Sequence, residues 1–193
     1  SVDIVDIRLT QNADLSAIDT DLTIDLEAFG SNLSSIAHID IADGKTLTVK
    51  SLTDGIDDVL DVTAATFEVS DASGNEGAVV VEADTKLKMT AGQANGHSVT
   101  GAGSVDVVDI EAKLDADLSA TDTDLTIDLE ADGRTSDIVL TSASIDVADG
   151  KTLTITSDAG GPDVLDVTAA TFEVSDASGN EGAVIVEADT KLK

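Results

Sequence analysis

The sequence lacks cysteine, tryptophan and tyrosine, and its 193 residues include only three phenylalanines, one proline and two histidines. Without cysteine the chain has no disulfides, thiolate metal ligands or cysteine nucleophile. No apolar run approaches the ~18 residues that span a bilayer. The opening Ser1–Asp3 has neither a basic nor an apolar signal region, so no signal peptide is expected within the sequence. These absences argue against disulfide-stabilised, thiolate-metal and membrane-spanning proteins.

Basic residues are also scarce. Ten Lys and Arg stand against 39 Asp and Glu, which gives a formal net charge of −29. Such a polyanion repels phosphate backbones and anionic lipid surfaces, so neither nucleic-acid binding nor direct membrane insertion is expected. The hydrophobic content of 41% and the mean hydropathy of +0.12 argue against disorder. The core must therefore be built from Val, Ile, Leu and Ala.

What the sequence does contain is a repeat. Residues 13–28 match residues 116–131 with one difference, and residues 58–88 match residues 163–193 except that Val80 becomes Ile185. Such long matches indicate a duplicated unit within an array.

The repeat divides the chain into two units, and one stretch has no counterpart. The first unit is residues 1–103, expected to hold five coils, with the Gly-rich residues 89–103 as its last coil or as a linker. The second unit is residues 104–193, an incomplete copy. Ser1 corresponds to Ser104 and Lys193 to Lys88, a phase that is expected of a piece cut from a longer array.

Short segments within each unit alternate apolar and polar residues, as strands with one buried face do. They include Leu47–Val49, Phe67–Val69 and Leu87–Met89, spaced about 20 residues apart, and a partner strand precedes each by five or six residues. Two short strands and two tight turns in about 20 residues predict an all-β fold, a parallel β-solenoid of about 20-residue coils. The alternative is a tandem array of immunoglobulin-like or cadherin-like β-sandwiches.

The 20-residue spacing also predicts a register. It stacks Thr48 on Glu68 and Glu68 on Lys88, so Glu68 and Lys88 are expected to be neighbours on adjacent strands. An open solenoid end is expected to expose unpaired strand edges, along which such chains stack end to end.

Catalytic constellations are scarce. His38 and His97 are expected at the surface, and the counterpart of His38 in the second unit is Ser144, which makes His38 a poor catalytic base. No nucleophile elbow or Ser/His/Asp set can be assembled. Pairs of carboxylates arise by chance among 39 acids, so the chain is predicted not to be an enzyme.

Two loops have the composition of calcium sites. Residues 70–77 and 175–182 carry the same sequence of Ser, Asp, Ala, Gly, Asn and Glu, and Ca²⁺ prefers oxygen ligands from such loops. Residues 158–166 resemble in part the Gly- and Asp-rich repeat of RTX secreted proteins. An ordinary Asx/Gly turn is the alternative. The candidate metal ligands are Asp71, Asn75, Glu76, Asp176, Asn180 and Glu181.

The near-identical units of about 100 residues, rich in Asp, Thr, Val, Gly and Ala, resemble the repeat regions of large secreted or surface-exposed bacterial proteins. These include adhesins, RTX-type surface proteins, and S-layer and sheath or filament components. The resemblance implies an extracellular or cell-surface structural module that self-associates and is stiffened by divalent cations. The competing hypothesis is a calcium- or glycan-binding adhesin domain.

Overall fold

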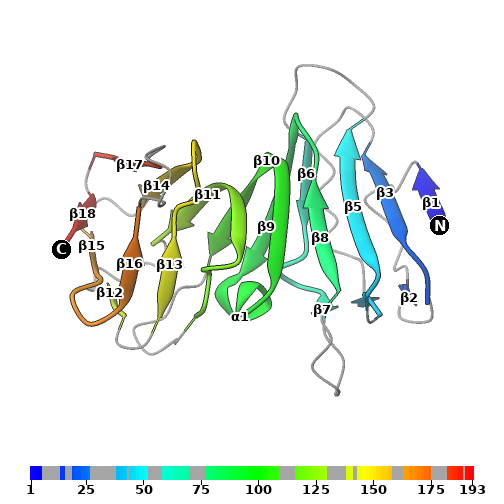
Figure 1. The fold of residues 1–193 in the computed structure, drawn as a ribbon, viewed down its shortest axis with the longest axis horizontal. Coiled ribbons are helices and arrows are strands. Elements are labelled where there is room, and N and C mark those ends of the chain that lie inside the picture. The colour runs from blue at the N-terminus through cyan, green and yellow to red at the C-terminus, as the bar shows by residue number, and fades with distance from the viewer. Residues whose placement is uncertain are drawn as a thin grey trace.

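The computed structural model describes residues 1–5, 14–15, 19–26, 38–42, 44–51, 58–69, 77–108, 116–129, 138–140, 143–157, 163–174, 182–188 and 190–193. Within these ranges the chain is nearly all β, and the strand pairs are parallel. The strands lie side by side along the long axis, with the two termini at opposite ends (Figure 1). The prediction of a parallel β-solenoid is confirmed, and the tandem β-sandwich, whose sheets are antiparallel, is excluded.

The largest sheet has ten strands and the other sheets have two or three. Eight of its strands follow one another in the order β1 (Val2–Val5), β3 (Leu22–Leu26), β5 (Thr46–Ser51), β8 (Ala78–Val81), β10 (Ser98–Val108), β11 (Thr121–Asp128), β14 (Thr152–Thr156) and β17 (Ala183–Val186). The other two are β9 (Thr85–Thr90), which pairs with β10, and β6 (Asp58–Asp61), which pairs with β9. The smaller sheets are β2 (Asp14–Leu15), β4 (His38–Asp40) and β7 (Thr66–Glu68); β12 (Ile138–Val139), β15 (Asp163–Asp166) and β18 (Thr190–Leu192); and β13 (Ser144–Asp146) with β16 (Thr171–Glu173).

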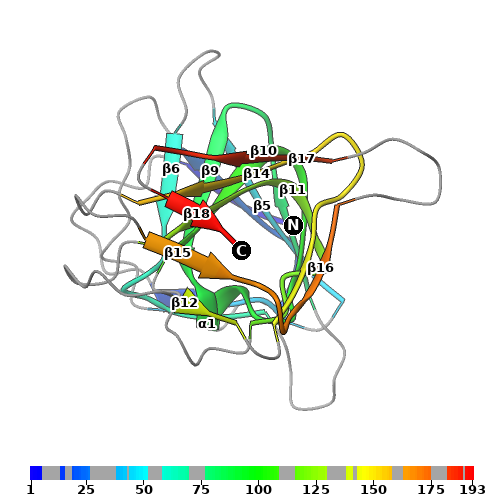
Figure 2. The ribbon, with the colours of Figure 1, turned by 90° about the vertical axis from the view of Figure 1, so that its left-hand side faces the viewer.

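One coil has three sides, which the end-on view shows as strands arranged around the axis (Figure 2). In the first unit β5, β6 and β7 follow one another around a coil, and β8 and β9 begin the next coil on top of β5 and β6. The predicted coil of two strands is therefore wrong, because β7 belongs to a third side that stacks on β4.

The predicted stack of Thr48, Glu68 and Lys88 is wrong for the same reason. Thr48 pairs with Val80, Glu68 pairs with Asp40 on the third side, and Lys88 pairs with Asp61. Alternation of apolar and polar residues is the same on all three sides, so it identifies the strands without telling which side each occupies.

The coils differ in length because their corners differ. Val2 pairs with Leu22 and Val79 with Val99, which gives the predicted 20 residues per coil in those places. By contrast, Leu47 pairs with Val79, 32 residues later, because more residues separate the successive strands of this coil. The strands nevertheless stack in register.

The two units do not occupy the same columns of strands. Leu47 of the first unit lies in the column that continues through Val79 and Val99 to Thr121. Its counterpart Leu153 lies in the neighbouring column, which starts with Leu60 and Leu87 and continues through Val105 and Leu125. The long strands β10 and β11 span both columns, so the second unit is displaced by one side of the solenoid.

Residues 89–103, which occur once in the sequence, form the end of β9, the short helix α1 (Ala91–Ala94) and the first half of β10. Thr90 caps the helix, accepting a hydrogen bond from the Gln93 backbone, while the Gln93 side chain accepts one from the Thr90 backbone. This segment lies between the first unit and the second. Because it has no counterpart elsewhere in the sequence, it displaces the second unit by one side of the solenoid relative to the first.

The interior is a column of aliphatic side chains. Leu22, Leu47 and Val79 stack on successive coils and are at most 1% exposed. Phe67 is also buried, whereas the equivalent Phe172 is only half-buried. Burial of apolar area at about 25 cal/mol per Å² stabilises such a stack, and the β-branched residues suit its pleated surface.

Candidate functional site

The predicted calcium ligands lie outside the described residues, namely Asp71, Asn75, Glu76, Asp176, Asn180 and Glu181. The structure describes the base of each loop. The Gly77 amide donates to the Val69 carbonyl at 2.8 Å, and the Gly182 amide donates to the Val174 carbonyl at 3.0 Å. The residues that flank each loop are therefore joined by a backbone hydrogen bond, and the calcium site stays a prediction.

Among the described residues, no group of three or more His, Cys, Asp or Glu side chains is placed to hold a metal ion. The same residues include no helix long and apolar enough to cross a membrane. His38 and His97, which were expected at the surface, are both half-buried. They lie on different elements, His38 in β4 and His97 just before β10.

Two buried aspartates occupy equivalent inward positions at the start of β6 and β15. Asp58 is 0% exposed and Asp163 is 1% exposed. One oxygen of each accepts a hydrogen bond from a serine hydroxyl, that of Ser51 or Ser157. The other oxygen has no hydrogen-bond partner among the described residues. Both units therefore interrupt their aliphatic interior with a carboxylate at this corner. Each buried oxygen without a partner lowers the stability of the fold.

The period of two already contained the signal for these aspartates. Leu60 is buried and points inward, so Asp58, two residues earlier on the same strand, also points inward. The next coil places the buried Thr85 beside Asp58 in register, and Thr190 lies beside Asp163 in the same way. Sequence reasoning did not identify this polar corner, although the period of two places both aspartates inward.

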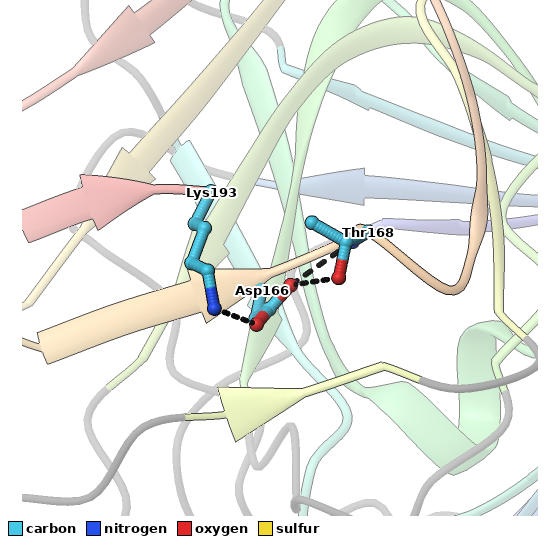
Figure 3. Close-up of polar contacts among 3 residues, drawn as sticks. All are labelled: Asp166, Thr168 and Lys193. Atoms are coloured by element: carbon cyan, nitrogen blue, oxygen red, sulfur yellow. Dashed lines mark hydrogen bonds and ion pairs between the residues drawn. The ribbon is translucent and has the colours of Figure 1, made fainter.

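A second polar cluster joins Asp166, Thr168 and Lys193 (Figure 3). The Thr168 hydroxyl and amide donate to one oxygen of Asp166 at 2.6 and 3.0 Å, and the Lys193 ammonium lies 3.0 Å from the other. These hydrogen bonds, those of Thr168 first, lower the pKa of Asp166 to about 2. The cluster fastens β18 to the corner that follows β15.

Ion pairs also link successive coils, and one of them includes the buried Asp25. The Lys50 ammonium lies 3.1 Å from a carboxylate oxygen of Asp25. The hydrogen bond that the lysine donates to this carboxylate raises the pKa of Lys50. Lys86 of β9 lies 3.3 Å from Asp106 of β10. Because Asp106 belongs to the second unit, this pair helps to hold the two units together, although a partly exposed pair of this kind contributes only about 0–1 kcal/mol.

The most distinctive surface is the end formed by β16, β17 and β18, which we name the C-terminal end surface. Each of these strands has one strand neighbour among the described residues: β13, β14 and β15, respectively. Val186 is 41% exposed and Ile185 is 50% exposed, whereas most large apolar side chains elsewhere are covered. The half-buried apolar residues of this surface are Phe172, Val174, Val184 and Leu192.

The first unit contains the same residues in a covered state. Its counterparts Val69, Val79, Val81 and Leu87 are all 0% exposed, and Phe67 is 6% exposed. What covers them is the next coil, of which β10 pairs with both β8 and β9. The exposed edge is the property that sequence analysis predicted for an open solenoid end, and the duplicated sequence shows what covers such an edge.

Comparison with known proteins finds no matching family model, no matching curated protein and no matching solved structure. A proposal for the function therefore depends on the chain's own residues and geometry.

Proposed function

We propose that the chain is a structural repeat module of an extracellular filament, surface layer or adhesin stalk. The observation that carries the proposal is the C-terminal end surface, where Val186 stays exposed on β17, a strand that has a free edge among the described residues. In a parallel solenoid every strand can add a further strand at its edge, so such an end supports growth along the axis.

The shape and charge support the same function. The strands stack in one direction between termini that lie at opposite ends (Figure 1), which suits a spacer or a filament element. The net charge of −29 keeps the sides of such rods apart, whereas their apolar ends favour contact. We expect the partners to be further copies of the module, together with divalent cations that screen its acids.

Electron microscopy and sedimentation of the purified chain test this function. The expected result is concentration-dependent assembly into rods or filaments one solenoid wide, with contacts at the ends. Dispersed monomers at high protein concentration, with and without Ca²⁺, would contradict the proposal.

A calcium- or glycan-binding adhesin domain is the second candidate. It is favoured by the two acidic loops of identical sequence, each closed at its base by one backbone hydrogen bond, from Gly77 to Val69 or from Gly182 to Val174. Ca²⁺ prefers oxygen ligands, which the Asp, Asn and Glu residues in the sequence of both loops offer.

A further inference from the structure

The chain contains two copies of nearly the same coil surface, one covered and one open. Residues 58–88 and 163–193 differ only at Val80 and Ile185. The strands of the first copy are β6 to β9, and those of the second are β15 to β18. Two surfaces with the same side chains and the same local pairing are expected to bind the same kind of partner, and the structure shows what covers the first.

That partner is the segment of residues 89–108. Its β10 adds a parallel strand along both β8 and β9, placing Val99 beside Val79 and Val105 beside Leu87. Since Val99 and Val105 are each 1% exposed, the contact is well packed.

The helix α1 adds a polar contact. The Gln93 side-chain amide donates hydrogen bonds to the carbonyls of Val62 at 2.7 Å and Ala65 at 2.9 Å. These carbonyls belong to the turn between β6 and β7. The turn recurs in the second unit, where the Ala170 amide donates to the Val167 carbonyl as the Ala65 amide does to that of Val62.

Two glycines make the close approach of β10 possible. A Cβ atom at Gly103 would lie 2.4 Å from the Glu82 carbonyl oxygen and 2.7 Å from a methyl group of Val81. A Cβ atom at Gly101 would lie 2.1 Å from the Val81 carbonyl oxygen. The covering segment therefore needs glycine at the two positions of β10 that cross the turn between β8 and β9.

We propose that the C-terminal end surface is a docking site for a polypeptide segment with the sequence features of residues 89–108. It adds a strand along β17 and β18, in the manner of β-augmentation. By equivalence with the first unit, its Val99 position faces Val184, its Val105 position faces Leu192, and its Asp106 position meets Lys191. The inference rests on the proposed structural role and identifies the partner for this end.

The test uses a labelled synthetic peptide of residues 89–108 and the whole 193-residue chain, with binding followed by fluorescence anisotropy. We expect saturable binding of one peptide per chain. The matched control is the same peptide with Gly103→Val, for which we expect affinity to fall by about tenfold or more, because its side chain meets the backbone of Glu187.

Variants of the chain locate the binding surface. Val186 corresponds to Val81, which is fully covered by β10, so Val186→Lys is expected to weaken peptide binding by about tenfold or more. The neighbouring Ile185 points to the opposite side of the strand, so Ile185→Lys is the matched control and is expected to bind nearly as tightly as the parent chain. Both positions lie in the outermost coil and are more than a third exposed, so both variants are expected to fold.

A fused form covers the case of a weakly binding peptide. A copy of residues 89–108 is appended after Lys193, and a second fusion carries the copy with Gly103→Val. We expect the first fusion to melt at a higher temperature than the second. Equal melting temperatures together with absent or glycine-independent peptide binding would overturn the docking proposal.

The outcomes separate this inference from the proposed function. If the chain assembles into rods but the peptide neither binds nor competes with assembly, the docking proposal fails and the structural module stands. If the peptide binds at Val186 but the chain stays monomeric at every concentration, the docking site stands and self-assembly fails.

Discussion

Asp166 connects two neighbouring coils at the scale of single residues. It lies at the end of β15 and accepts hydrogen bonds from Thr168, while Lys193 reaches it from the next coil (Figure 3). The pKa of Asp166 is lowered to about 2 from an ordinary 3.8, which means that the folded chain stabilises the ionised carboxylate more than the unfolded chain does. The stability of the last coil therefore depends on the charge of Asp166, whereas its apolar contacts do not depend on ionisation.

The consequence for pH follows from the direction of that shift. A carboxyl whose folded pKa is depressed contributes stability above its unfolded pKa, and the contribution is lost as pH falls through the folded pKa. We expect Asp166→Asn to be less stable than the parent chain at neutral pH. The difference in the free energy of unfolding should shrink as pH falls from about 4 to about 2, measured by chemical denaturation with circular dichroism. A difference that is constant from pH 7 to pH 2 would contradict this role.

At the scale of elements, β10 is the strand on which the two units depend. It is 11 residues long and pairs with β8, β9 and β11, so it fastens two columns of strands together. Its bend between the columns occurs at Gly101 and Gly103, where the backbone lies against the preceding coil. A side chain at this bend would separate the coils.

We expect Gly103→Ala to lower the free energy of unfolding by at least about 2 kcal/mol, because its Cβ atom would overlap the backbone oxygens of Glu82 and Thr85. The matched control is Gly44→Ala. Gly44 has a positive φ of 63° with no atom within 4 Å of an added Cβ, so only the backbone conformation costs energy there, about 1 kcal/mol. Urea denaturation measures both, and equal losses would show that the contact at Gly103 is not tight.

The elements also show how far sequence reasoning reaches. The alternation in Leu47–Val49 and Phe67–Val69 correctly predicts strands of a parallel solenoid. It fails to assign Glu68 to the third side, because every side has the same alternation and only the corner lengths decide which strands stack. The displacement of Leu153 by one column relative to Leu47 depends on residues 89–103, whose path no periodicity reveals.

The sites follow the same division. The polar corner at Asp58 follows from extending the period of two back from Leu60, whereas its hydrogen bond with Ser51 depends on how the chain turns the corner. The free edge at the end of the stack follows from the solenoid itself. Its partner segment follows from the duplication, once the structure shows that residues 89–108 cover the first copy.

For the whole molecule, the controlling quantity is the net charge of −29 on a chain with ten basic residues. Lys50, Lys86 and Lys193 each lie against an aspartate on a neighbouring strand, so the few cations bridge coils. The remaining acids repel one another through the solvent. Self-repulsion of this kind destabilises a compact state, and salt screens it over about 10 Å at 0.1 M and about 3 Å at 1 M.

Salt therefore provides a test at this scale, and calcium sharpens it. We expect the melting temperature to rise as NaCl increases from about 0.01 M to about 1 M, because screening weakens the repulsion among the acids.

If the loops at residues 70–77 and 175–182 hold Ca²⁺, millimolar CaCl₂ should raise the melting temperature by about 5 °C or more beyond NaCl of the same ionic strength. A double variant, Asp71→Asn with Asp176→Asn, should lose this extra rise and keep the response to NaCl. Equal responses to the two salts in the parent chain would contradict the calcium site and favour diffuse counterions. That result would leave the solenoid, its free end and the proposed docking segment unaffected, because those rest on apolar edges and backbone pairing.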